Sequence, residues 1–125
     1  MKTLTKAEEQ IMQILWDLKE GVAKQVVDGF GENKPAYTTV ATVLKVLEKK
    51  GFVGSRKVGN VNLFSPKISK KAYTGFQFSA LLKNYFNGSF PKMATFFAKE
   101  NNLSINELEE MLKITESELD KENKS

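Results

Sequence analysis

Apolar residues near the start of the chain recur at the spacing of one face of a helix. These residues are Ile11, Ile14, Leu15 and Leu18. Thr5 and Glu8 precede them with the spacing of a capping box, in which each side chain accepts a hydrogen bond from the other residue's backbone amide. The pattern predicts a helix that Gly21 ends, followed by a second, short helix over residues 23–29.

A third apolar pattern predicts a helix that begins near Pro35–Tyr37 and runs to Lys50. Its buried stripe has the spacing i, i+3, i+4 and i+7, and consists of Val40, Val43, Leu44 and Leu47. The remaining face carries Thr38, Thr39, Thr42, Lys45, Val46 and Lys49. Threonine is a middling helix former, and capping explains one of the three at most. Small hydroxyls with methyl groups at the start of a helix can instead meet base edges of DNA.

A lysine-rich β-hairpin is predicted directly after this helix. The segments Phe52–Val58 and Val61–Ser65 are rich in β-forming residues, and Gly59-Asn60 between them suits a two-residue turn. Three helices followed by a basic hairpin is the order of a winged helix-turn-helix, whose third helix enters the major groove of DNA while the hairpin contacts phosphates or a minor groove. The expected fold is therefore mainly α with a small β-hairpin wing.

The last third of the chain is predicted to be helical over residues 70–87 and 90–99, and again from Ser104 into a charged, frayed tail. Six of the nine phenylalanines lie after residue 75, and a segment of about fifty residues does not easily bury so much aromatic surface by itself. Either the two chains of a homodimer share one core here, or these helices fold back onto the N-terminal domain. We favour the homodimer, because a DNA reader gains a two-fold site from it.

This interpretation divides the chain into two domains. Residues 1–68 form a winged-helix DNA-binding domain, and residues 69–125 form a helical dimerisation domain with a frayed tail. The predicted dimerisation residues are Phe76, Leu82, Phe86, Phe96, Phe97, Leu108, Met111 and Leu112.

Composition narrows the classes of function. The chain has neither histidine nor cysteine, so it lacks the commonest general base and the thiolate and imidazole ligands of metal sites, and we expect no enzyme activity, metal or cofactor. Glu8, Glu9 and Gln10 interrupt any signal peptide, and the longest apolar runs are too short to span a bilayer. We therefore expect a cytoplasmic protein that does not bind membranes.

The net charge of +4 is unevenly distributed along the chain. Residues 34–71 contain nine basic residues and one acid, Glu48, a net charge of +8, whereas residues 1–33 and 72–125 each carry −2. A basic middle between acidic ends is typical of a protein that binds a polyanion. The alternative is that these lysines form an ordinary solvated face.

Four stretches of the sequence together resemble the BlaI/MecI (penicillinase repressor) family: "LTKAEEQIMQILW", "YTTVATVLKVLEKKGFV", the Gly59 hairpin with "LFSP", and "FFAKENNLSINELEEM". The resemblance runs from about Leu4 to Leu112. It implies a winged-helix repressor that dimerises through its C-terminal helices and binds two-fold operators in double-stranded DNA. It also implies release by proteolysis, triggered by a membrane-bound sensor metallopeptidase, with cleavage near the bond Phe96–Phe97.

Two departures from the family pattern bear on function. Family members often carry basic residues near Ala41 and Val46, so the operator preference or affinity of this chain is expected to differ. The copper-responsive branch of the family needs a cysteine-rich tail, and this chain has no cysteine.

The resulting hypothesis is a dimeric, sequence-specific transcriptional repressor. Thr38, Thr39 and Thr42 would read bases, while Lys45 and Lys49 would flank the groove. Arg56 and Lys57 would contact the phosphate backbone from the wing. Two alternatives stay open: a winged-helix module that binds other proteins, and a protein that binds DNA without sequence preference.

Overall fold

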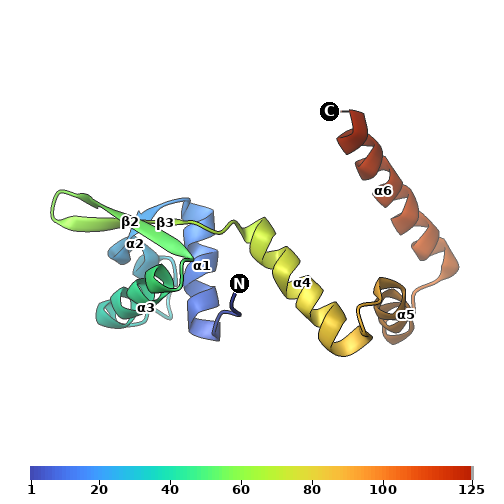
Figure 1. Cartoon of the computed structure of the whole chain (residues 1–125), viewed down its shortest axis with the longest axis horizontal. Coiled ribbons are helices and arrows are strands. Elements are labelled where there is room, and N and C mark those ends of the chain that lie inside the picture. Colours follow the sequence, from blue (N-terminus) through green and yellow to red (C-terminus); the bar gives the residue numbers. More distant parts are fainter. Residues whose placement is uncertain (125) are drawn as a thin grey trace. The chain divides into compact units, whose positions relative to one another are not determined.

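The structure is a computed structural model, and it describes residues 1–124 (Figure 1). Its elements, in chain order, are α1 (Lys6–Leu18), β1 (Gly21–Val22), α2 (Ala23–Asp28), α3 (Tyr37–Lys49), β2 (Val53–Val58), β3 (Val61–Pro66), α4 (Lys70–Phe86), α5 (Phe90–Glu100) and α6 (Ile105–Lys124). The predicted helices and the predicted hairpin are confirmed. The contacts within the chain divide it into two compact units, residues 1–79 and a second unit that begins at Ala80.

The capping box predicted at the start of α1 is present. The amide of Thr5 donates to Glu8 Oε1 at 2.8 Å, and the amide of Glu8 donates to Thr5 Oγ1 at 3.2 Å. Two amides that the first turn would leave without helical acceptors are thereby satisfied.

The first unit contains a three-stranded antiparallel sheet with the strand order β1-β3-β2. The hairpin β2–β3 turns at Gly59, whose φ of +62° suits a glycine at the first central position of a type II′ turn. The strand β1 was not predicted: Gly21 and Val22 pair with Phe64 and Leu63, more than forty residues later in the chain. Two residues are too short to show the alternation that identifies a strand in sequence.

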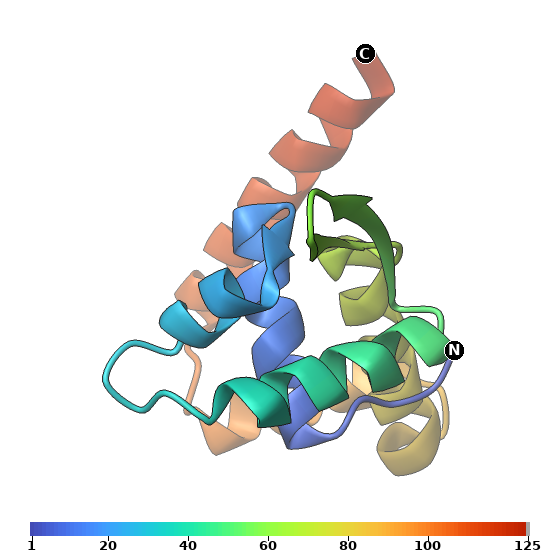
Figure 2. The same cartoon turned by 90° about the vertical axis from the view of Figure 1, so that its left-hand side faces the viewer.

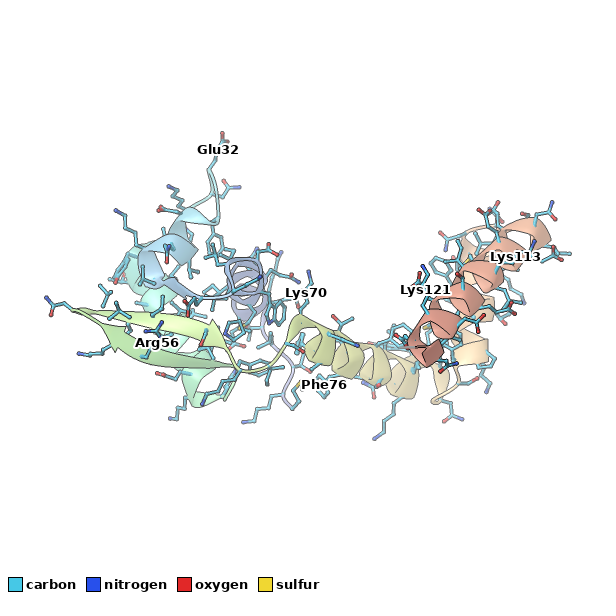
Figure 3. The ribbon with its side chains drawn as sticks, turned by 90° about the horizontal axis from the view of Figure 1, so that it is seen from above. Glu32, Arg56, Lys70, Phe76, Lys113 and Lys121 are labelled. Atoms are coloured by element: carbon cyan, nitrogen blue, oxygen red, sulfur yellow. The ribbon has the colours of Figure 1, made fainter. Side chains whose placement is uncertain are left out.

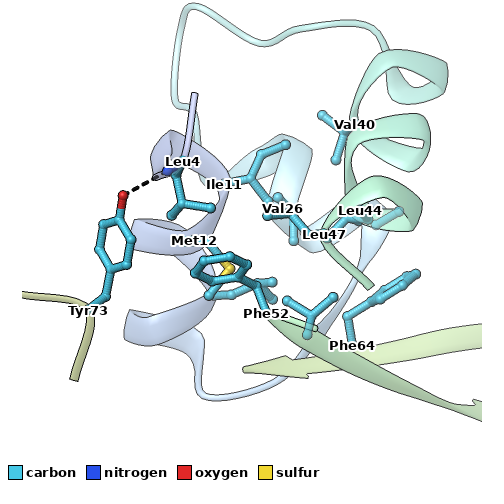
Figure 4. Close-up of a cluster of buried hydrophobic side chains, with 13 residues drawn as sticks. Leu4, Ile11, Met12, Val26, Val40, Leu44, Leu47, Phe52, Phe64 and Tyr73 are labelled. Carbon is cyan, nitrogen blue, oxygen red and sulfur yellow. Dashed lines mark hydrogen bonds between the residues drawn. The ribbon is translucent and has the colours of Figure 1, made fainter. Parts of the chain in front are cut away.

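The core of the first unit lies between α1, α2, α3 and the sheet (Figure 4). Each of these elements contributes buried side chains, and the fully buried large ones are Met12, Leu15, Val26, Val40, Leu44, Leu47, Phe52 and Val53. Figure 2 looks onto α2, α3 and the hairpin, which share one side of this unit. The core therefore fixes α3 against the sheet and leaves its other face to solvent.

The start of α4 packs into the first unit through Tyr73. Its hydroxyl accepts a hydrogen bond from the amide of Leu4 at 2.8 Å (Figure 4), and its ring lies 5.8 Å from that of Phe52. The indole N–H of Trp16 donates to the carbonyl of Ile68 at 2.9 Å, just before the helix begins. The contacts thus place residues 70–79 with the first unit, while the predicted functional boundary after residue 68 stays a prediction.

The second unit comprises the end of α4 with α5 and α6, and none of its residues 80–123 is buried. Serine side chains cap two of its helices: Ser89 Oγ accepts from the Lys92 amide at 3.2 Å, and Ser104 Oγ accepts from the Glu107 amide at 3.1 Å. Phe86 and Phe96 pack with ring centroids 5.5 Å apart. Within residues 1–124, no helix combines the length and apolar character needed to cross a membrane.

Candidate nucleic-acid interface

Four polar residues form a ridge along the exposed side of α3. Because an α-helix turns by about 100° per residue, these residues lie opposite the buried Val40 and Leu44. We call this set the outer ridge: Thr38, Thr42, Lys45 and Lys49. Thr39, the remaining predicted contact on this helix, is also exposed but lies on a flank beside Val46. The structure therefore brings the predicted residues of α3 onto one solvent-facing surface.

None of the three threonines caps the helix. The residue at the N-cap of α3 is Ala36, which offers no side-chain acceptor. Thr42 Oγ1 instead donates to the carbonyl of Thr38 at 2.9 Å, one turn earlier. That bond uses the hydroxyl proton of Thr42 and leaves its oxygen lone pairs and its methyl group available to a ligand.

The two basic residues predicted on the wing lie on opposite faces of the hairpin. Side chains alternate along a strand, so Ser55 and Lys57 share a face with Asn62 and the buried Phe64, with which they pair. This is the inner face of the hairpin, since Ser55 Oγ donates to Glu48 Oε2 of α3. Arg56 lies on the outer face of the hairpin (Figure 3).

Arg56 is engaged by an acid outside the basic segment. Its guanidinium lies 3.7 Å from Glu20 Oε2, and both side chains are more than half exposed. Exposed pairs of this kind contribute about 0–1 kcal/mol. A phosphate could therefore replace Glu20 as the partner of Arg56 at little cost.

Lys50, at the end of α3, is held by an ion pair with Glu8. Its amine lies 2.7 Å from Glu8 Oε2 and 3.0 Å from Oε1, and the carboxylate is buried. Burial by itself raises the pKa of Glu8, but the hydrogen bonds from Lys50 and from the Thr5 amide, together with the charge of Lys50, outweigh it and lower that pKa. Lys50 therefore fastens α3 to α1, and its charge is partly neutralised within the protein.

Further polar residues that the sequence did not predict lie on this side of the unit. Tyr37, Asn60 and Asn62 line a groove between α3 and the hairpin, together with Lys24 of α2. Counting alternate residues back from Phe64 would have placed Asn62 on the inner face of the hairpin. No sequence signal would have brought Lys24 to the same groove, because that proximity depends on how α2 packs.

Comparison with known proteins identifies relatives over almost the whole chain. The model of the penicillinase repressor family matches residues 4–117. The penicillinase repressor of Bacillus licheniformis is 25% identical over 114 residues, which cover 90% of this chain and 89% of that protein. The methicillin resistance regulatory protein MecI of Staphylococcus aureus is 22% identical over 112 residues, covering 89% and 91%.

A solved structure resembles part of the chain. The solution structure of the DNA-binding domain of the repressor BlaI superposes with a TM-score of 0.50 and 26% sequence identity. The match covers 58% of this chain and 94% of that domain. The order of helices and hairpin and the exposed outer ridge of α3 are those expected of a winged-helix protein. With the family model matching residues 4–117, the chain belongs to the penicillinase repressor family of winged-helix proteins.

Proposed function

We propose that the protein is a dimeric repressor of transcription that binds a two-fold operator in double-stranded DNA. The observation that carries this proposal is the outer ridge of α3, which lies on an exposed face within a segment of net charge +8. The likeness of 58% of the chain to the DNA-binding domain of BlaI supports the same function. The proposal involves no catalysis and no cofactor.

Within this proposal the residues of α3 read the major groove. Thr38, Thr39 and Thr42 offer hydroxyl oxygens and methyl groups to base edges, including the methyl group of thymine. Lys45 and Lys49 lie on the outer ridge one and two turns after Thr42, and they contact the phosphates that border the groove. These contacts would fix the helix in its register before the bases are read.

The hairpin would contact the backbone with both of its faces. Lys57 on the inner face points to the side of α3, and Arg56 on the outer face points away from it. A hairpin placed along a minor groove has one strand of DNA on each side, so the two residues would bind different strands.

Dimerisation is proposed through the second unit. Seven of the eight predicted dimerisation residues lie there: Leu82 and Phe86 are half-buried, and Phe96, Phe97, Leu108, Met111 and Leu112 are exposed. Phe76 lies in the first unit, with its ring 6.0 Å from that of Tyr73. Apolar surface of this extent is unfavourable in water and favours association with a second copy.

Release by proteolysis is the finer part of the proposal. A cut at the bond Phe96–Phe97, within α5, would separate α6 from α4 and from the first unit. A membrane-bound sensor metallopeptidase is the protease expected from the resemblance. The loss of α6 would convert a two-site binder into a one-site binder and lower its affinity.

The experiment that tests the function is a mobility-shift titration at two salt concentrations. The probe is a duplex that the wild-type protein selects from a random pool. With about three to five phosphate contacts in each half-site, log K should fall against log salt with a slope of roughly −5 to −9. A docking module for other proteins would retain no duplex, and a non-specific binder would retain all sequences alike.

Two variants then separate base reading from backbone binding. Thr39→Ala should relax the base preference at one position and weaken binding to the selected duplex by about 1–3 kcal/mol. Lys57→Ala should weaken binding to selected and scrambled duplexes alike. If both variants changed the two affinities by the same ratio, the roles assigned to helix and wing would be wrong.

A further inference from the structure

A groove of about 340 Å³ lies between α2, α3 and the hairpin. Its floor and sides include the apolar residues Ala41, Val61 and Phe64, and its polar side chains are Lys24, Tyr37, Lys45, Asn60 and Asn62. The groove joins α3 to the inner face of the hairpin. Among the residues named above, only Lys45 belongs to the outer ridge, so most of this surface has no role in the function proposed so far.

The chemistry of the groove is that of a site for an anion with apolar neighbours. Two amines, two amides and a phenol can all donate hydrogen bonds, and none of the ten residues that line the groove is acidic. In the described part of the chain, the side chains of Lys24, Asn60 and Asn62 form no hydrogen bond or ion pair. The donors are thus available to a ligand.

A strand of DNA offers the complementary surface. Its phosphates are acceptors that carry one charge for every 3.4 Å along each strand, and the sugars between them present C–H groups to apolar side chains. When a helix occupies the major groove and a hairpin lies along the next minor groove, the strand that separates the two grooves passes between them. In this unit, the space between α3 and the inner face of the hairpin is the groove described above.

We infer that this groove seats one sugar–phosphate strand of the operator, with Lys24, Asn60 and Asn62 donating to its phosphates. Tyr37, at the first turn of α3, adds its hydroxyl at the same rim. The inference rests on the proposed function and extends it to four residues outside the outer ridge and the basic pair of the wing. It also gives a role to the two asparagines at the tip of the hairpin, Asn60 in the turn and Asn62 on β3.

The test uses the full-length protein and the duplex selected by the wild type. Lys24→Ala and Asn62→Ala change exposed or groove-lining side chains, so both should fold with wild-type circular dichroism and melting temperature. Lys121→Ala is the control for charge, since Lys121 lies on α6 in an exposed pair with Glu118 (Figure 3). Ser65→Ala is the control for the strand, since alternation places it on the outer face of the hairpin. Each groove variant should lose about 10-fold in affinity, and each control less than about 2-fold.

Neutral methylphosphonates, placed one at a time along the duplex, locate the contact. The wild type should lose about 10-fold at one or two adjacent phosphates of each half-site, and Lys24→Ala and Asn62→Ala should lose nothing further at those positions. In addition, Lys24→Ala should make the slope of log K against log salt less negative by roughly 2, because the dimer loses one phosphate contact in each half-site.

The outcomes separate the inference from the function on which it rests. If the wild-type protein selects no duplex, the proposed function fails. If the wild type binds but the groove variants behave like Lys121→Ala and Ser65→Ala, the inference alone is overturned. A second pair of results also overturns it. The wild type would show no methylphosphonate-sensitive position, and inorganic phosphate would displace DNA readily from the wild type but not from Lys24→Ala. The groove would then bind free phosphate rather than a strand of DNA.

Discussion

The two units of the chain use their apolar residues in opposite ways. In the first unit, residues from α1, α2, α3, the sheet and the start of α4 meet in one buried core. In the second unit no residue from 80 to 123 is buried, although the helices carry phenylalanines, leucines and isoleucines at regular spacing. The first unit closes a core of its own, whereas the second unit leaves most of its apolar helix faces exposed, apart from contacts such as that between the rings of Phe86 and Phe96.

This difference in burial predicts that the second unit, and not the first, is stabilised by association with another copy. Helices as short as α5, with 11 residues, are marginal in water unless an apolar face is packed. In α6 the apolar residues Ile105, Leu108, Leu112 and Leu119 follow a heptad-like spacing, and all are exposed. The stability of the second unit should therefore vary with protein concentration, and that of the first unit should not.

The largest expected effect comes from removing α6. A chain that ends at Phe96 should be monomeric in analytical ultracentrifugation and should bind the selected duplex about 10²–10⁴-fold more weakly, because the advantage of two linked sites is lost. A chain that ends at Ser117, which retains the residues of the family match, is the control and should remain dimeric. A dimer with unchanged affinity after truncation at Phe96 would exclude both dimerisation through α6 and release by cleavage at this bond.

A matched pair of leucines tests the comparison directly. Leu44→Ala empties a fully buried site in the first unit and should lower its free energy of unfolding by about 2–5 kcal/mol. Leu112, on α6, is 59% exposed in the single chain, so Leu112→Ala should act through the proposed dimer interface. Thermal unfolding at two protein concentrations should show a constant effect for the first variant and a concentration-dependent effect for the second. Equal behaviour of the two variants would contradict the distinction between the units.

The buried ion pair makes the first unit sensitive to acid. The folded-state pKa of Glu8 is lowered, so its stabilisation is present above the ordinary glutamate pKa of about 4.3 and is lost as the pH falls through the lower folded value. Glu8→Gln should lower the free energy of unfolding at pH 7 by about 1–3 kcal/mol and weaken its decline in acid. Urea unfolding between pH 7 and pH 3 measures the free energy of unfolding and its decline in acid. Glu9→Gln is the control, because Glu9 does not contact Lys50, and it should keep the acid dependence of the wild type.

The smallest expected change in stability comes from Tyr73→Phe, which tests where the first unit ends along α4. Tyr73→Phe removes the acceptor of the Leu4 amide and should cost about 0.5–1.5 kcal/mol, independent of protein concentration. Phe86→Leu, on the same helix but in the second unit, should alter stability in a concentration-dependent manner. If the effect of Tyr73→Phe also varied with concentration, the start of α4 would belong with the second unit.

Local signals in the sequence predicted the regular elements. The capping box of Thr5 and Glu8, the stripe of Val40, Leu44 and Leu47, and the turn at Gly59 each depend on residues close together in the chain. The strand β1 and the bond from Trp16 to the Ile68 carbonyl were missed because both join segments more than forty residues apart. Such contacts depend on packing and leave little trace in composition or spacing.

The candidate site was likewise predictable within each element but not between elements. Helical spacing placed Thr38, Thr42, Lys45 and Lys49 on one side of α3, and the structure agrees. The sequence predicts Arg56 and Lys57 together as contacts of the wing, whereas alternation along a strand makes adjacent residues face opposite ways. The ion pair between Lys50 and Glu8 could not be foreseen, because its partners lie 42 positions apart and meet only when α1 packs against α3.

Trp16 gives the protein an intrinsic spectroscopic reporter at the point where α4 begins. It is the only tryptophan in the chain, its indole N–H bonds to the carbonyl just ahead of α4, and its ring lies 6.1 Å from that of Tyr73. Indole emission shifts to longer wavelength when the ring gains contact with water. The fluorescence of the unlabelled protein should therefore report how the start of α4 packs on the rest of the first unit, during folding and on addition of DNA.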